Sequence, residues 1–210
     1  MENSLTNVYS NFIDLRRIDD NSIIIDAGAC FGLFIEALRK KPEASKCRVI
    51  ALECDRDNAK ALERKKFLNL KICKRALVGQ SSAKNTLFYQ YVGLPGWGST
   101  INRRVWHKKC KEVRKYEVGT VRINDIFKDL SIEHIDFLKM DIEGAEMEVL
   151  DTMTRKTASK ITQLSVEVHK PPLQESRPVF KKMLERLGYK AQIVGVDVVY
   201  GIQKRAKGRR

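Results

Sequence analysis

The sequence lacks grouped cysteines, and this absence argues against two common ways of stabilising a protein. Its cysteines are odd in number, scattered along the chain and never arranged as C-x-x-C. A disulfide framework is typically indicated by an even number of cysteines, and a structural zinc site by C-x-x-C-type spacing. We therefore expect reduced, intracellular and mostly buried thiols at Cys30, Cys47, Cys54, Cys73 and Cys110.

The sequence also shows neither the pattern expected of a signal peptide nor a long hydrophobic run. The first residues, MENSLTNVYSNF, are polar or acidic where a signal peptide has a cationic start followed by an apolar stretch. No later run reaches the roughly 20 apolar residues that a membrane-spanning helix needs. We predict a cytoplasmic protein with no membrane span.

The composition is otherwise that of a globular protein with an excess of positive charge. Hydrophobic residues make up 43% and charged residues 31% of the 210 residues, but 40 Lys and Arg face 26 Asp and Glu, for a net charge of +14. A chain of this length fits one domain, which we place at 1–204, with an N-terminal extension (1–20) and an insertion at about 81–118. A basic tail follows at 205–210. The sequence shows no internal repeat.

Apolar β-branched runs alternate with amphipathic helical segments along the chain. This alternation is typical of an α/β fold with a doubly wound, mostly parallel sheet and helices on both faces. A hairpin turning at 195–197 is expected to close the fold with antiparallel strands. The expected strands lie at 23–25, 48–53, near 70–78, and at 84–92, 134–141, 161–169, 190–195 and 197–204.

A glycine-containing turn follows the first of these strands. In "DAGACFG", residues 26–32, an acid at the strand end precedes two glycines, so that backbone can approach a ligand closely. Glu53 ends the next strand, where a carboxylate can accept hydrogen bonds from ribose hydroxyls. Cys30 stands where a dinucleotide motif has its second glycine, which disfavours a pyrophosphate cofactor. The alternative is a tight turn with solvated acids.

Several segments together resemble a known enzyme family. "IIIDAGACFGLF", "VIALECDRDNAKAL", "HIDFLKMDIEGAEMEVL" and "VEVH" occur in the order found in FkbM-type S-adenosylmethionine-dependent methyltransferases, which are class I, Rossmann-like enzymes. The resembling segments span about residues 23–169. The family commonly has Asn where Cys30 stands, and its Asn after the acid matches Asn58.

The resemblance implies S-adenosyl-L-methionine as cofactor and S-adenosyl-L-homocysteine as product. The glycine loop would lie along the methionine and ribose, Glu53 would hold the ribose hydroxyls, and Ala76 would lie near adenine. The implied cofactor-binding residues are Asp26, Gly28, Ala29, Cys30, Gly32, Glu53, Cys54, Ala76 and Asp141.

Four carboxylates crowd into "DFLKMDIEGAE", residues 136–146. If the apolar run is a central parallel strand, Asp141 emerges at its carboxyl end, where open α/β sheets bind ligands. Glu143 and Glu146 would lie near the start of the next helix. The helix dipole stabilises negative charge there, which is a sufficient structural explanation for Glu146. Asp136, at the opposite end, is expected to be solvated, and Lys139 to pair with Asp141 or contact a substrate.

Glu167 and His169 end the neighbouring strand and share one face of it. Methyl transfer to a hydroxyl or amine needs an in-line approach and a proton acceptor. Our catalytic candidates are therefore Asp141, Glu143, Glu167 and His169. Two alternatives remain open: His169 is a surface residue, or the group holds a divalent cation such as magnesium or manganese.

Residues 103–115, "RRVWHKKCKEVRK", contain seven Lys or Arg and one Glu. Such a run beside the loop 93–104, which could act as a lid, suggests an anionic acceptor such as RNA, a nucleotide-linked sugar or a phosphorylated glycan. Trp97, Trp106 and Tyr116 could stack on a base or sugar. A solvated helix face is the alternative.

Two functions therefore remain. The first is O-methylation of a hydroxyl on a sugar, glycan or metabolite. The second is RNA methylation or a non-catalytic nucleic-acid binding module, although no RRM or KH motif is present.

Overall fold

A seven-stranded sheet forms the centre of the protein. The computed structural model describes residues 5–80, 83–92, 100–101, 112–169 and 173–203. The strand order is β11-β12-β10-β9-β3-β4-β5; the five strands from β10 to β5 are parallel, and β12 runs antiparallel to both of its neighbours. The strands are β3 (Ile23–Ala27), β4 (Arg48–Leu52), β5 (Leu70–Cys73), β9 (Ile135–Met140), β10 (Ile161–Glu167), β11 (Tyr189–Val194) and β12 (Val198–Gln203).

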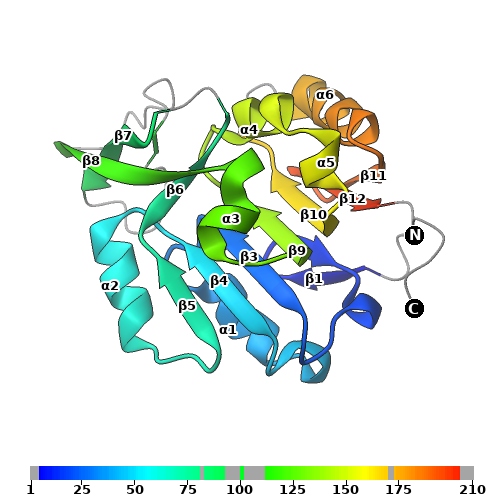
Figure 1. The fold of residues 1–210 in the computed structure, drawn as a ribbon, viewed down its shortest axis with the longest axis horizontal. Helices are drawn as coiled ribbons and strands as arrows, with labels where there is room; N and C mark the ends of the chain where they lie inside the picture. Colours follow the sequence, from blue (N-terminus) through cyan, green and yellow to red (C-terminus); the bar gives the residue numbers. More distant parts are fainter. Residues whose placement is uncertain (1–4, 81–82, 93–99, 102–111, 170–172, 204–210) are drawn as a thin grey trace.

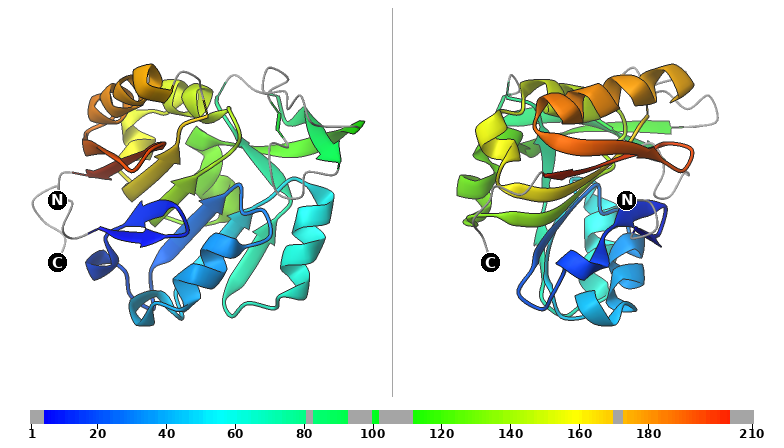
Figure 2. Two further views of the ribbon diagram at one scale, coloured as in Figure 1. Left: turned by 180° about the vertical axis from the view of Figure 1, so that it is seen from behind. Right: turned by 90° about the vertical axis from the view of Figure 1, so that its right-hand side faces the viewer.

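The central strands are buried on both faces, which explains their continuous apolar runs. Neighbouring residues of one strand contribute to different cores: Ile24 belongs to one cluster and Ile25 to the other. Helices cover both faces (Figures 1 and 2), as the sequence predicted. One core is covered by α3 (Ile126–Leu130), α4 (Glu146–Thr152), α5 (Arg155–Ala158) and α6 (Leu173–Arg186), the other by α1 (Leu33–Arg39) and α2 (Arg56–Arg64).

The N-terminal extension folds onto the same side as α1 (Figure 2, left). It forms a hairpin of β1 (Thr6–Val8) and β2 (Asn11–Ile13), followed by the 3-10 helix η2 (Leu15–Arg17). Val8 and Ile13 are fully buried in the core beneath α1. The extension is therefore part of the packed structure rather than an appendage, which hydrophobic periodicity over such short strands did not reveal.

A second, three-stranded sheet lies beside the carboxyl end of β4. Its order is β6-β8-β7, formed by β6 (Arg75–Val78), β7 (Asn85–Val92) and β8 (Glu112–Arg122). The single strand expected near 70–78 is thus two strands in two sheets. The remaining 3-10 helices are η3 (Pro42–Ala44) and η4 (Ile123–Asp125).

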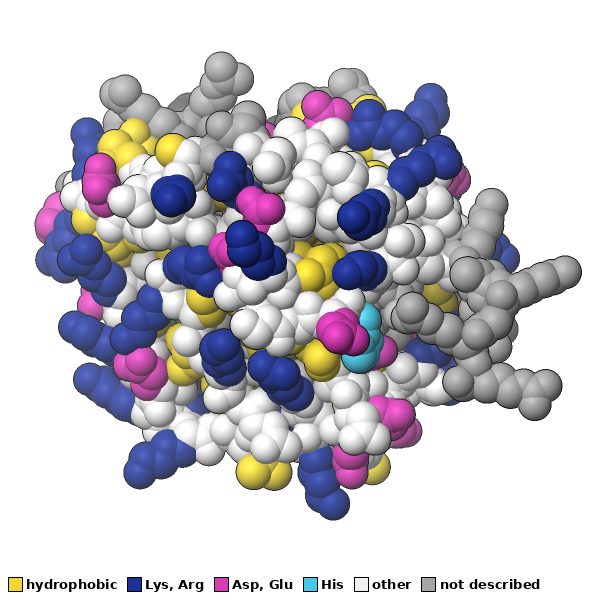
Figure 3. Space-filling view, viewed as in Figure 1, with side chains coloured by type: hydrophobic (Ala, Val, Ile, Leu, Met, Phe, Trp, Pro, Cys, Tyr) yellow, Lys and Arg dark blue, Asp and Glu magenta, His cyan; other side chains and the backbone are white. Residues whose placement is uncertain are grey.

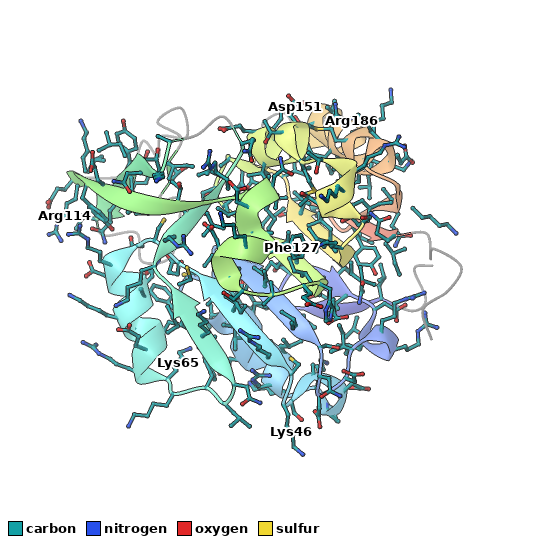
Figure 4. All side chains as sticks on the ribbon, viewed as in Figure 1. Lys46, Lys65, Arg114, Phe127, Asp151 and Arg186 are labelled. Atoms are coloured by element: carbon teal, nitrogen blue, oxygen red, sulfur yellow. The ribbon has the colours of Figure 1, made fainter. Side chains whose placement is uncertain are left out.

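The end of the fold matches the expected pattern. Helix α6 stops at Arg186, and Gly188 follows with φ of 98°, a conformation suited to glycine. On the outer surface Arg186 of α6 pairs with Asp151 of α4 at 3.3 Å (Figure 4). Strands β11 and β12 then form the predicted antiparallel hairpin, paired from Val194 with Val198.

The structure can be compared with the expected burial of four of the cysteines and with the expected lack of a membrane span. Among the described cysteines, Cys47 is buried, whereas Cys30, Cys54 and Cys73 are half-buried, so burial is less complete than expected. In the described part of the chain no helix has the length and apolar character needed to cross a bilayer. Cys110 and the basic tail lie outside the described residues.

Candidate active site

Acidic side chains from neighbouring strands meet at the carboxyl edge of the central sheet. Asp26 lies near the end of β3, Glu53 follows β4, Asp141 follows β9, and Glu167 ends β10. Strand β3 lies where the order reverses, since the chain continues to β4 on one side and β9 lies on the other. This switch point is where open α/β sheets bind ligands.

The turn after β3 is held in close contact with the segment after β9. Gly28 has φ of 77°, and a Cβ atom there would lie 1.7 Å from the carbonyl oxygen of Asp141. Its N–H donates to the carbonyl of Leu52 at 2.9 Å. Only glycine fits this position, because any side chain would collide with backbone.

Glu53 is buried, and its carboxylate organises the same turn. One oxygen accepts the N–H of Cys30 at 2.6 Å, and the other accepts the N–H of Asp55 at 2.7 Å. Burial raises the pKa of Glu53 to about 7, although these two hydrogen bonds oppose the shift. Each oxygen keeps a second lone pair available for a hydroxyl donor.

A pocket of about 630 Å³, including its open mouth, lies between the two sheets beside Glu53. Its wall combines apolar side chains with this carboxylate, a composition common in small-molecule sites. Asn58, which matches the family's Asn after the acid, also lines it. We call it the first pocket; its lining includes Gly28, Cys30, Leu52, Glu53, Cys54, Ala76, Leu77, Phe88, Asp141 and Glu143.

Other predicted cofactor residues lie elsewhere. Ala29 lines a second pocket on the opposite side of the turn. Gly32 is the N-cap of α1, and a Cβ atom there would lie 2.4 Å from Leu62, so its conformation serves helix packing. Their roles in cofactor binding remain predictions.

Lys139 links the strand ends through a buried ion-pair network. Its ammonium lies 3.1 Å from Asp26 and 3.0 Å from Asp141, and donates to the carbonyl of Gly28 at 3.1 Å. Asp26 and Lys139 are register partners on β3 and β9. Burial alone would lower the pKa of Lys139, but the two carboxylates raise it well above its usual range. The expected pairing with Asp141 is confirmed, and it extends to Asp26.

Glu146 has a larger role than starting a helix. It is 1% exposed, and its oxygens accept the N–H groups of Ile142 at 2.9 Å and Gly144 at 3.0 Å. One oxygen also lies 2.9 Å from Nδ1 of His169. Glu146 therefore shapes the 141–144 loop and orients the imidazole. Sequence reasoning missed this, because spacing does not reveal that a residue at a helix start turns inward.

His169 lies among carboxylates rather than on the open surface. Its Nε2 atom is 3.6 Å from oxygens of Asp141, Glu143 and Glu167, and its side chain is 17% exposed. Burial lowers its pKa, but Glu146, Glu143 and Asp141 outweigh this and raise it to about 10. At neutral pH His169 is therefore protonated, which argues against a general base.

Glu167 differs from its neighbours in its electrostatic environment. Burial and the nearby charge of Asp141 raise its pKa to about 7, while His169 opposes the shift. A carboxylate with this pKa can take up and release a proton near neutral pH.

A cation site is the alternative use of this cluster. Ligand atoms of Asp141, Glu167 and His169 lie within 4.8 Å of one another. A cation bound at Nε2 would displace the proton of His169, so metal binding and protonation exclude each other at this nitrogen.

Asp136 also departs from expectation. It accepts the N–H of Ile23 at 2.8 Å and lies 3.2 Å from His134, with 22% of its side chain exposed. It therefore clamps β3 to β9 instead of being simply solvated.

The basic run is only partly described. Positions 112–115 belong to β8, a strand rather than a helix, and Arg114 lies at its outer end (Figure 4). Tyr116 is already engaged by Phe88, at 5.5 Å between ring centroids, and by the Arg56 guanidinium, 4.4 Å from its ring. On the face in Figure 3, Lys and Arg are spread widely and mixed with acids. Trp97, Trp106 and most of the proposed lid lie outside the described residues.

Comparison with known proteins identifies the family. Residues 26–192 match the methyltransferase FkbM domain. The chain belongs to the FkbM methyltransferase family. A relative with similar sequence is "Methyltransferase sdnD" of Sordaria araneosa. It is 30% identical to this chain over 203 residues, and the match covers 84% of this chain and 76% of that protein.

Solved structures agree with the family fold. The FkbM methyltransferase of Methylobacillus flagellatus KT has a TM-score of 0.54 at 17% identity, covering 88% of this chain and 44% of that chain. The Methanococcus jannaschii fibrillarin pre-rRNA processing protein has a TM-score of 0.52 at 14% identity, covering 89% and 68%. At these identities the likeness shows the fold alone. The FkbM-family chain described here spans less than half the length of the Methylobacillus protein.

Proposed function

We propose that this FkbM-family protein is an S-adenosyl-L-methionine-dependent O-methyltransferase. The observation that carries the proposal is Glu53, a buried carboxylate in the wall of the first pocket, fixed by two backbone N–H groups beside the Gly28 turn. Carboxylates at this strand end accept hydrogen bonds from both hydroxyls of a ribose. The apolar wall near Leu77 and Phe88 suits an adenine ring.

The chain's own residues supply position and a proton acceptor. When bound, S-adenosyl-L-methionine provides an electrophilic methyl group on a sulfonium. For an acceptor hydroxyl to take this methyl group, its proton would have to pass to a carboxylate of the chain. We assign this proton to Glu167, because Asp141 is paired with Lys139 and His169 is already protonated.

Asp141 and Glu143 have a different part in this proposal. Both lie on the walls of the first and the second pocket, so they border the place where methyl donor and acceptor would meet. Glu146 keeps the loop that carries them in place. S-adenosyl-L-homocysteine would be the product, and no metal is required.

Calorimetric titration of S-adenosyl-L-homocysteine into the purified protein tests the cofactor. We expect micromolar affinity that weakens by roughly 1.5–3 kcal/mol in Glu53→Ala, since charged hydrogen bonds are lost. Glu63→Ala, an exposed carboxylate of α2 paired with Lys74, is the matched control. NAD should not bind.

A folded protein that fails to bind S-adenosyl-L-homocysteine would contradict the proposal. Salt-dependent RNA binding unaffected by Glu53→Ala would then favour the nucleic-acid module instead.

A further inference from the structure

A row of cations lies along the exposed side of α2. Arg56, Lys60 and Arg64 recur every four residues, and all three are exposed. The opposite side of the helix, with Ala59 and Leu62, is buried in the core. Since a helix rises about 1.5 Å per residue, the row is about 12 Å long. We call the three cations the α2 row; they lie at an outer margin of the molecule, which is at the left in Figure 1.

The α2 row is not explained by the stability of the helix. Arg56 is the first helical residue, and a cation is unfavourable at the N-terminal end of a helix dipole. Like charges four residues apart repel each other, as Arg56 and Lys60 do, and then Lys60 and Arg64. Arg64, in the last turn, is the member of the row that the dipole favours. The arrangement therefore destabilises α2 unless an anion lies against it.

The acids of this segment do not neutralise the row. Glu63 pairs with Lys74 at 2.8 Å, and Asp57 accepts a hydrogen bond from Gln90 of β7 at 2.9 Å. Among the residues that the structure describes, neither Lys60 nor Arg64 forms an ion pair. The exposed cations from 56 to 74 are Arg56, Lys60, Arg64, Lys65, Lys66, Lys71 and Lys74, and the exposed acids are Asp57 and Glu63. This margin of the molecule is therefore strongly positive.

The second sheet holds the N-terminal end of the row in place. The Tyr116 hydroxyl on β8 accepts the N–H of Arg56 at 3.2 Å, and the Arg56 guanidinium lies 4.4 Å from the centre of that ring. Arg114, two residues away on the same face of β8, is also exposed (Figure 4). Asn58, in the first turn of α2, lines the first pocket. The row thus begins beside that pocket.

A ligand that matches the row must carry several negative charges along its length. A nucleic-acid strand has a phosphate for about every 3.4 Å of its axis, so about three phosphates face a row of this length. Surfaces that bind single strands combine cations with aromatic rings and with arginines that contact them, as Arg56 and Tyr116 do. An anionic membrane fits less well, because the apolar side of α2 is buried and cannot insert.

We propose that the α2 row, together with Arg114, is a docking surface for single-stranded nucleic acid. The group that it recognises is the phosphate backbone, which RNA and DNA share. The proposal goes beyond the proposed function, because it assigns a partner without requiring that this partner accept the methyl group. Of the basic run that the sequence analysis singled out, only Arg114 takes part.

Fluorescence anisotropy with labelled oligonucleotides tests this surface. An RNA strand of about 20 nucleotides, a DNA strand of the same sequence and the RNA duplex are titrated with the full chain at about 50 to 200 mM salt, without cofactor. We expect Lys60→Ala/Arg64→Ala to bind both single strands about tenfold more weakly at the lowest salt. The plot of log affinity against log salt should become shallower by about 1.4, since each phosphate contact contributes roughly 0.7. The strand that the wild type binds more tightly identifies the sugar of the partner.

The matched control is Arg155→Ala/Lys156→Ala, which removes one Arg and one Lys from exposed positions of α5. It should keep the affinity and the salt dependence of the wild type. Urea denaturation should show that Lys60→Ala/Arg64→Ala is at least as stable as the wild type, because the repulsion along α2 is removed. A loss of binding would then not come from unfolding.

Four results would overturn the proposal. The first is an equal loss of affinity in both double variants, which would reduce the effect to net charge. The second is tighter binding of the duplex than of either single strand. The third is equal competition by inorganic polyphosphate of the same charge, which has no bases. The fourth is binding to phosphatidylserine vesicles without binding to the oligonucleotides, which would assign the row to a membrane surface instead.

Discussion

Cofactor affinity should depend on pH through Glu53. The ionised carboxylate accepts hydrogen bonds from ribose hydroxyls, whereas the protonated form has lost charge and one acceptor site. With a pKa of about 7 in the free protein, roughly nine tenths of Glu53 is ionised at pH 8 and about one tenth at pH 6. Affinity should therefore be nearly full at pH 8 and should fall as the pH drops through 7.

The size of the effect follows from these fractions. Between pH 8 and pH 6 the loss is about tenfold, or about 1.4 kcal/mol. In Glu53→Gln, an amide NH₂ must face the N–H of Cys30 or of Asp55, so the turn loses a partner as well as the charge. We expect roughly 10- to 150-fold weaker binding in this variant at pH 8.

Calorimetry of S-adenosyl-L-homocysteine from pH 5.5 to 8.5 measures both effects. The Glu53→Gln profile reveals any contribution from other groups, including Glu167, and Glu63→Gln should keep the wild-type profile. A wild-type affinity that is constant over this range would refute the reasoning. The reasoning would also be refuted if Glu53→Gln bound S-adenosyl-L-homocysteine as tightly as the wild type at pH 8 and still lost affinity at acidic pH.

Three further variants test the buried contacts by urea denaturation. Lys139→Met should lower the free energy of unfolding by about 3–5 kcal/mol, because it leaves the fully buried Asp26 without its charged partner; a loss under 1 kcal/mol would contradict the network. Gly28→Ala should cost about 2–4 kcal/mol through collision and backbone strain, whereas Gly119→Ala, 3.3 Å from a flexible Arg side chain, should cost under 1; equal costs would count against the close approach. Glu146→Ala should cost about 2–4 kcal/mol by leaving two N–H groups without their acceptor and should lower the pKa of His169, followed by NMR; an unchanged histidine titration would oppose the assigned contact.

The sequence allowed the mostly parallel sheet and its carboxyl edge to be predicted, because strands buried on both faces read as apolar runs. Glu53 could be placed for the same reason: it follows such a run directly. Glu146 and the N-terminal hairpin could not be placed. The inward turn of Glu146 depends on a loop with Glu143 at φ of 54°, and the hairpin depends on strands far away in the chain.

The net charge of the chain was the sequence property that predicted least about the candidate active site. The net charge of +14 describes the whole surface, whereas the edge of the sheet is governed by a few carboxylates whose neighbours are set by register. Asp136 illustrates the same point, since only the pairing of β3 with β9 makes it a partner of Ile23.

The anchoring of the hairpin to β10 also has a consequence for biosynthesis. Asp14 and its partner Gln163 of β10 are 149 positions apart. During synthesis the N-terminal hairpin therefore cannot form these contacts until β10 has been made. At roughly 5–20 residues per second, this delay is about 7–30 seconds. During that interval Val8 and Ile13 have no completed core to enter, and a nascent chain interrupted before β10 would expose them to chaperones.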